Sequence, residues 1–152
     1  MSTTKPLDGI KVIEISTIIT ASLSAMMLSD QGAEVIKIEQ TGFGDPLRYL
    51  GTQKGGISAI FANTNRGKKS IELDLKNESD LEQAKKLISE ADVLINNFRP
   101  GVMDSLGLGK EDCKALNKNL IYVAITGFGK EGPYANAPAY DHVVQAMSGS
   151  TA

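Results

Sequence analysis

The residue types that most often carry out chemistry are scarce in this sequence. His142 is its one histidine and Cys113 its one cysteine, so a zinc site built from nitrogen and sulfur ligands is not expected. A hydrolytic triad would have to use His142, and no Gly-x-Ser-x-Gly motif accompanies it. Both residues fall in segments with helical patterns, where a surface histidine and a half-buried structural cysteine are common. We therefore expect no metal ligand within the chain, and neither residue is expected to be catalytic.

One glycine motif, at residues 127–132, matches the G-x-G-x-x-G pattern of dinucleotide-binding folds. That pattern requires a helix to begin there, so that the amides of its first turn meet a pyrophosphate. Pro133 and Pro138 follow instead and predict a turn or loop. The turn at residues 16–21 has no glycine, and Glu39 at the end of the second strand is weak support on its own. Binding of NAD is therefore not expected.

Two other segments resemble phosphate-binding motifs. Gly109-Lys110 resembles the end of a P-loop, but Asp104 stands where that motif needs glycine and Glu111 where it needs serine or threonine. The basic segment 65–69, Asn-Arg-Gly-Lys-Lys, has two interpretations, a loop that holds phosphate or a solvated hairpin.

Length and composition place the chain among globular proteins. Its 152 residues suit one domain, and 41% hydrophobic and 22% charged residues are close to the globular average. A net charge of −2 supplies no field for nucleic acid or an anionic membrane, and no apolar stretch reaches the length of a membrane span. The N-terminus lacks the apolar region of a signal peptide, and a single cysteine excludes an intramolecular disulfide. A reducing, cytoplasmic location is expected.

Hydrophobic periodicity predicts strands that alternate with helices. Strands are expected at residues 11–15, 34–39, 69–75, 92–96 and 119–126. Helices are expected at residues 20–30, at 81–91 after a helix start capped by Asn77, at 110–117 and at 141–147. Strands separated by helices imply right-handed βαβ units, and therefore an α/β, Rossmann-like fold with a mostly parallel sheet and flanking helices. Ligands of such sheets bind at the loops after the strands, which points to the irregular segments 40–67 and 127–140.

Several segments occur in the same order as in one family of enzymes. They are residues 6–14, 32–39, Gly44-Asp45 with Arg48, 65–76, 97–103, Gly127-Phe128-Gly129 and 139–149. Together they resemble the N-terminal portion of a family III CoA-transferase, the group that includes formyl-CoA and carnitine CoA-transferases and the α-methylacyl-CoA racemases. The resemblance covers residues 6–150 and is more specific than any single short motif.

The resemblance implies that residues 1–152 form the CoA-binding, N-terminal part of a Rossmann-like large domain. In this family two chains interlock as a homodimer, and each has a small second domain and a C-terminal return that this sequence does not contain. The implied activity is acyl-CoA:carboxylate CoA transfer without a metal. The family's nucleophile is an aspartate in a Gly-Asp motif that would follow Ala152 and would form a mixed anhydride. The chain alone is then expected to be inactive and prone to self-association.

Contacts with CoA follow from the resemblance position by position. The residues implied are Ile19, Thr20, Leu73, Asp74, Leu75, Lys76, Asn97, Phe98, Arg99, Tyr140 and Asp141. Arg99 offers phosphate a planar cation with several donors. Phe98 has two interpretations, an apolar face for the ligand or a plug in the core.

Departures from the family's patterns narrow the activity. Gln40 and Ser105 stand where formyl-CoA transferases have arginines, and Ile19 replaces a glutamine of their active site, which argues against formyl and oxalate chemistry. Racemases have histidine where this chain has Tyr140, and a phenol with an ordinary pKa of about 10 is a poor base at neutral pH. Transferase is therefore favoured over 2-methylacyl-CoA racemase. A CoA-binding or interaction module without chemistry is the third alternative.

Overall fold

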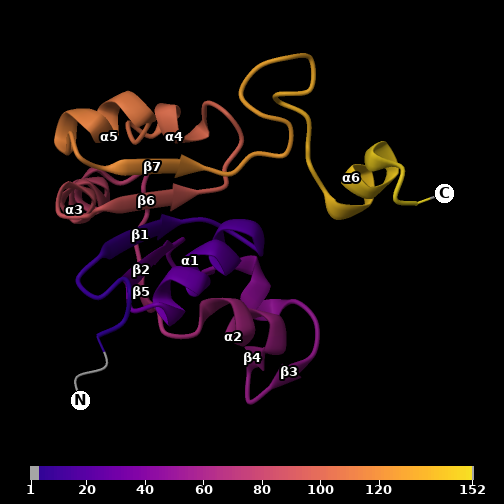
Figure 1. Cartoon of the computed structure of the whole chain (residues 1–152), viewed down its shortest axis with the longest axis horizontal. Coiled ribbons are helices and arrows are strands. Elements are labelled where there is room, and N and C mark those ends of the chain that lie inside the picture. The colour runs from indigo at the N-terminus through magenta and orange to yellow at the C-terminus, as the bar shows by residue number, and fades with distance from the viewer. Residues whose placement is uncertain (1–3, 152) are drawn as a thin grey trace.

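A parallel β-sheet of five strands forms the centre of the fold. The structure, a computed structural model, describes residues 4–151. In sheet order the strands are β5 (Lys69–Glu72), β2 (Glu34–Glu39), β1 (Lys11–Ile15), β6 (Val93–Asn96) and β7 (Ile121–Ala124). The chain starts in the middle strand, builds outward to β5 and then crosses back to β6 and β7 (Figure 1). The predicted α/β, Rossmann-like fold is confirmed, with third and fifth strands shorter than the periodicity indicated.

Helices lie between the strands along the chain and after the last of them. They are α1 (Thr20–Asp30), α2 (Ala59–Asn65), α3 (Glu78–Ser89), α4 (Val102–Ser105), α5 (Lys110–Leu116) and α6 (Asp141–Ser148). The second helix expected from the sequence begins at Glu78, because Asn77 Oδ1 accepts hydrogen bonds from the amides of Ser79 and Asp80 at 2.9 and 3.3 Å. Among residues 4–151, none of the helices has the length and apolar character needed to cross a membrane.

Each face of the sheet buries its own apolar core, because strand side chains alternate between the two faces. Val12 of β1 packs with Ala21 and Ala25 of α1 on one face. Ile13 of the same strand belongs to the other core, together with Ile88 of α3. The sheet is therefore held from both sides, and its strand ends are fixed relative to one another.

The segment 40–67, which the sequence analysis treated as irregular, contains short regular elements. Before α2 come η1 (Pro46–Tyr49), a turn of 3₁₀ helix, and the paired strands β3 (Gln53–Lys54) and β4 (Ile57–Ser58). The hairpin turns at Gly55 and Gly56, whose φ angles of +61° and +79° suit the central positions of a type I′ turn. Two residues per strand are too few to give a periodicity, so in the sequence only this Gly-Gly pair indicates the hairpin.

The C-terminal helix α6 stands away from the sheet at the end of a long linker (Figure 1). None of its side chains is buried, and Val143, Val144 and Met147 are 40%, 43% and 53% exposed. No helix begins between Gly127 and α6, so the glycine motif there lacks the helix that a dinucleotide fingerprint needs.

We expect the 152-residue chain, expressed alone, to self-associate. Its helix α6 leaves an apolar face uncovered, the edge strand β7 exposes 61% of Ile121, and such surfaces pair with other chains. Size-exclusion chromatography with light scattering should show species above the monomer mass. Replacing Val143, Val144 and Met147 by glutamine should shift the population toward monomer. A single monomer peak for the unchanged chain at every concentration would contradict this prediction.

Candidate functional site

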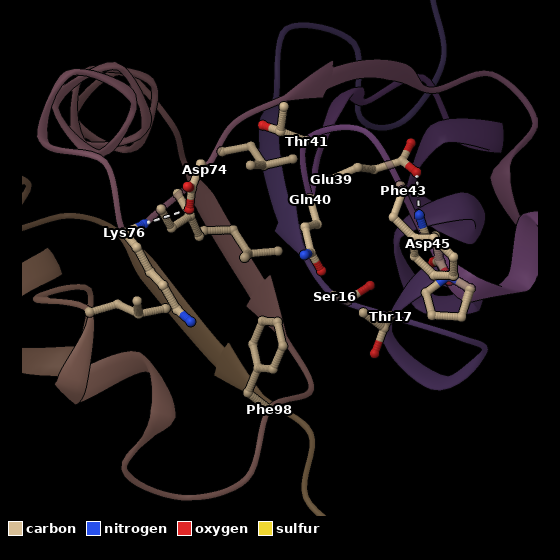
Figure 2. Close-up of a pocket in the computed structure, with 16 residues that line it drawn as sticks. Ser16, Thr17, Glu39, Gln40, Thr41, Phe43, Asp45, Asp74, Lys76 and Phe98 are labelled. Atoms are coloured by element: carbon tan, nitrogen blue, oxygen red, sulfur yellow. Dashed lines mark hydrogen bonds between the residues drawn. The ribbon is translucent and has the colours of Figure 1, made fainter.

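A cavity of about 450 Å³ opens at the edge of the sheet where the strands end (Figure 2). Its lining includes Ser16 and Thr17 after β1, Gln40 and Thr41 after β2, and Phe43 beyond them. Loops after β5 and β6 complete it. The volume is in the range of small-molecule sites, and the carboxyl edge is where ligands of open α/β sheets bind. This cavity is the candidate functional site.

Four of the residues predicted to contact CoA line this cavity. Asp74, Leu75 and Lys76 come from the loop after β5, and Phe98 comes from the loop after β6 (Figure 2). The amide of Lys76 donates a hydrogen bond of 3.0 Å to Asp74 Oδ1, which holds the turn. Phe98 packs against the core and also lines the cavity, so contact of its ring with a ligand stays a prediction. Leu73 is 5% exposed within the core and does not line the cavity.

Asn97 uses its side chain to join two loops at the edge of the cavity. Its Oδ1 accepts a hydrogen bond from the Thr17 amide at 3.1 Å, and its Nδ2 donates to the Thr17 carbonyl oxygen at 2.7 Å and to Thr20 Oγ1 at 3.1 Å. Ile19 and Thr20 lie at the start of α1, at the same edge. Arg99 is exposed in the loop after β6. Direct contact of these residues with CoA stays a prediction.

The structure does not bring Tyr140 and Asp141 to the cavity. Both lie at the start of α6, where Tyr140 is 66% exposed (Figure 1). In this chain they are therefore separate from the other residues predicted to contact CoA.

Cys113 is fully buried, which differs from the half-buried position expected of it, whereas His142 lies on the surface as expected. Cys113 is buried, its thiol donates to the Leu108 carbonyl oxygen at 3.3 Å, and burial raises the pKa of Cys113 to about 11. The thiol is protonated at neutral pH and is not a nucleophile. The His142 side chain is 97% exposed, with Nδ1 4.0 Å from Asp141 Oδ2.

Four buried charged side chains that sequence reasoning missed lie next to the cavity. They are Glu14, Lys37, Asp45 and Lys68, hereafter the ionic cluster. Lys37 Nζ lies 2.6 Å from Glu14 Oε1 and 2.9 Å from Asp45 Oδ2. Lys68 Nζ lies 2.7 Å from Glu14 Oε2, and every side chain of the cluster is at most 2% exposed. Two cations balance two anions, as buried charges require.

Hydrogen bonds and neighbouring charges shift the pKa values of Glu14 and Lys68. The hydroxyls of Ser16 and Ser22 donate to Glu14 Oε1 at 2.6 and 2.9 Å. Burial would raise the pKa of Glu14, but Lys37 and Lys68 outweigh it and hold that pKa below its ordinary value. Burial lowers the pKa of Lys68, and Glu14 opposes the shift. In the sequence, Glu14 and Lys37 each interrupt an apolar strand, but only the register of β1 and β2 shows that they pair.

Glu39, the acidic residue at the end of β2, is fully engaged within the protein. Arg48 binds both of its oxygens, with Nε at 2.8 Å and Nη2 at 2.6 Å, while Ser70 Oγ and the Asp45 amide add bonds of 2.6 and 2.8 Å (Figure 2 shows the latter). Burial opposes the ionised form, yet these donors lower the pKa of Glu39 to about 2. A Cβ on Gly44 would come within 3.0 Å of Glu39 Oε2, so the turn needs glycine. Glu39 is not free to bind a ribose, as dinucleotide folds require.

The basic segment joins α2 to the parallel strand β5, so it is not a hairpin. Arg66 pairs with Asp30 of α1 at 2.5 Å, and Lys69 pairs with Glu34 of β2 at 2.5 Å. Lys68 belongs to the ionic cluster. All three cations of the segment therefore have partners within the protein, and phosphate binding by this loop stays a prediction.

Removing the central cation of the ionic cluster should destabilise the protein strongly. We expect Lys37→Met to lower the free energy of unfolding by about 3–5 kcal/mol, because Glu14 and Asp45 would lose a buried partner. Urea unfolding at pH 7 measures the change. The matched control is Lys69→Met, which breaks a solvent-exposed ion pair and should therefore cost much less stability. Equal losses in the two variants would contradict the prediction.

Glu39 should make the free energy of unfolding depend on pH in the acidic range. Its pKa is lowered on folding, so its stabilisation is complete above the ordinary value of 4.5 and is lost as the pH falls toward about 2. We expect the free energy of unfolding of the unchanged protein to exceed that of Glu39→Gln at pH 7, and the difference to shrink between pH 4.5 and about 2. Glu14 titrates in both proteins, so its contribution cancels. A difference that stays constant with pH would refute the assignment.

Comparison with known proteins places these features in a family. The sequence matches CoA-transferase family III over residues 7–152. The acetyl-CoA:oxalate CoA-transferase of Acetobacter aceti is 46% identical over 144 residues, which are 95% of this chain and 37% of that protein. The succinate–glutarate CoA-transferase of Agrobacterium fabrum is 42% identical over 151 residues, which are 95% of this chain and 38% of that protein.

The fold agrees with the sequence match. A crystal structure of a CAIB/BAIF family protein from Brucella suis has a TM-score of 0.91 and 43% identity, over 97% of this chain and 40% of that one. The chain spans less than half the length of the proteins it matches. From the match along nearly its whole length and the shared fold, the chain belongs to CoA-transferase family III.

Proposed function

We propose that this chain is the CoA-binding, N-terminal part of an acyl-CoA:carboxylate CoA-transferase. The observation that carries the proposal is the cavity at the carboxyl edge of the sheet, where Asp74, Leu75, Lys76 and Phe98 meet in a chain of this family. A volume of about 450 Å³ suits the nucleotide end of CoA as a ligand.

The charges around the cavity are compatible with a polyanionic ligand. Two carboxylates of its lining, Glu39 and Asp45, are each paired with a cation of the protein, which limits their repulsion of phosphate. Lys76 adds a cation to the lining, and the exposed Arg99 offers phosphate a planar set of donors at the same edge of the sheet. Phe98 supplies an apolar surface for an adenine ring.

The chemical step that we propose uses a carboxylate beyond residue 152. Its attack on the thioester carbonyl of an acyl-CoA expels the CoA thiolate and leaves a mixed anhydride on the enzyme. The thiolate then attacks the enzyme's own carbonyl in this anhydride, which releases the donor acid and leaves a CoA thioester on the enzyme. The acceptor carboxylate attacks that thioester and expels the thiolate, and the thiolate finally takes the acceptor's acyl group from the new anhydride, which frees the enzyme carboxylate. Residues 1–152 alone would bind CoA without transferring it.

Partners and location complete the proposal. The uncovered apolar face of α6 supports an interlocked homodimer, in which a second chain covers it. The buried, free thiol of Cys113 supports a reducing, cytoplasmic location.

The names of the two relatives mention oxalate, succinate and glutarate, so dicarboxylic acids are the acceptors to screen first. Oxalate is included, although Ile19 argued against it.

Two alternatives make different predictions. In a 2-methylacyl-CoA racemase, a base must remove the α-proton, and Tyr140 stands here in place of the histidine. Deuterium incorporation at the α-carbon would support that activity. An interaction module without chemistry would bind CoA in the intact protein and transfer none of it.

CoA should bind the intact protein that carries this chain, and Lys76→Ala should weaken binding about tenfold, because a phosphate loses a cationic partner. Isothermal titration calorimetry with CoA at low salt measures the dissociation constant. Lys86→Ala on α3, an exposed lysine away from the cavity, is the control and should leave binding unchanged. Absence of CoA binding by the unchanged protein would overturn the proposed function.

A further inference from the structure

The loop between β1 and α1 contains a strained residue beside the cavity. Ile18 has a φ of +66°, and it is the one non-glycine residue with positive φ in the part of the chain that the structure describes. A β-branched side chain strongly disfavours this left-handed conformation, which persists only where surrounding contacts impose it. The two preceding residues, Ser16 and Thr17, line the cavity. The conformation of Ile18 therefore determines where the backbone of this cavity wall runs.

Two side chains hold this loop, one from the segment after β2 and one from the segment after β6. Asp45 Oδ1 accepts hydrogen bonds from the Ile18 amide at 3.0 Å and from the Leu47 amide at 2.9 Å. Asn97 bonds to both the amide and the carbonyl oxygen of Thr17, at 3.1 and 2.7 Å. A loop clamped on two successive residues has little freedom to relax the strain at Ile18.

The ionic cluster fixes the carboxylate of Asp45. Its Oδ2 lies 2.9 Å from Lys37 Nζ at an angle that makes an ion pair without a hydrogen bond, and Glu14 holds Lys37 from the other side at 2.6 Å. The Asp45 amide is bonded to Glu39 Oε2 at 2.8 Å. The side chain is fully buried, so water cannot replace these partners.

We propose that Asp45 is a positioning residue for CoA. It acts through the Ile18 amide and holds loop 16–19 in the strained conformation that shapes the cavity wall. The proposal rests on the proposed function, since it concerns the same cavity. It assigns the ionic cluster a task beyond stability, which is to orient Asp45 toward the loop.

The test uses the intact protein and five variants, with two main readouts. Calorimetry gives the affinity for CoA, and amide hydrogen exchange reports on residues 16–19. We expect Asp45→Asn to weaken CoA binding about tenfold and to speed exchange in this loop, because the charged acceptor is lost. Adding Ile18→Gly to that variant should restore most of the affinity, since glycine adopts positive φ without strain.

Asp92→Asn is the matched control for the substitution. Asp92 Oδ2 accepts a hydrogen bond of 2.8 Å from the Lys11 amide at the opposite edge of the sheet, so CoA affinity and exchange in residues 16–19 should not change. Ile18→Gly alone should raise the unfolding temperature, whereas Ile19→Gly should lower it, because Ile19 has an ordinary φ of −106°. Comparing Ile18→Gly with Ile19→Gly tests the backbone strain at Ile18 even if Asp45→Asn does not fold.

Three results would overturn the proposal. They are unchanged affinity and exchange in Asp45→Asn, no recovery on adding Ile18→Gly, and equal destabilisation by Ile18→Gly and Ile19→Gly. Failure of the unchanged protein to bind CoA would instead overturn the proposed function. The exchange readout would then still decide whether Asp45 holds the loop.

Discussion

The arrangement of the strands and loops around the cavity depends on the two ion pairs of the Lys37 ammonium group. This group lies between Glu14 of the neighbouring strand and Asp45 of the loop after β2, at 2.6 and 2.9 Å, with 1% of its side chain exposed. A cation so buried has no water to stabilise it, so strand, loop and lysine must adopt an arrangement that satisfies all three charges. Ala21 and Ala25 of α1 leave room for the helix to pack over this face of the sheet.

The ion pairs of Lys37 affect the cavity because they hold the loops that line it. Parallel strands end at one edge, so the segments after β1, β2, β5 and β6 converge there. The ionic cluster then determines how the first two of these loops lie, while Glu39 and Arg48 close the turn at Gly44. A cavity proposed for an anionic ligand can therefore contain Glu39 and Asp45, because both of these carboxylates are already paired with a cation.

Much of the fold could be predicted because it depends on local patterns. The alternation in residues 34–39 indicated a strand, Asn77 indicated a helix start, and the spacing of the elements indicated parallel pairing. The candidate site was predicted in part, since Lys76 and Phe98 line the cavity. Tyr140 does not, and its position could not be predicted because α6 is separated from the sheet by a long linker.

By itself, the sequence determined the order and type of the main elements and the family to which the chain belongs, because periodicity, caps and colinear motifs are carried by neighbouring residues. Only the tertiary structure decided which charges are buried and which partners they take. Lys68 and Lys69 are adjacent and chemically identical, yet the first is 2% exposed beside Glu14 and the second 70% exposed beside Glu34. Neighbouring side chains point in different directions, and the partner of Lys68 lies 54 residues away along the chain, so the difference arises only when the strands pair.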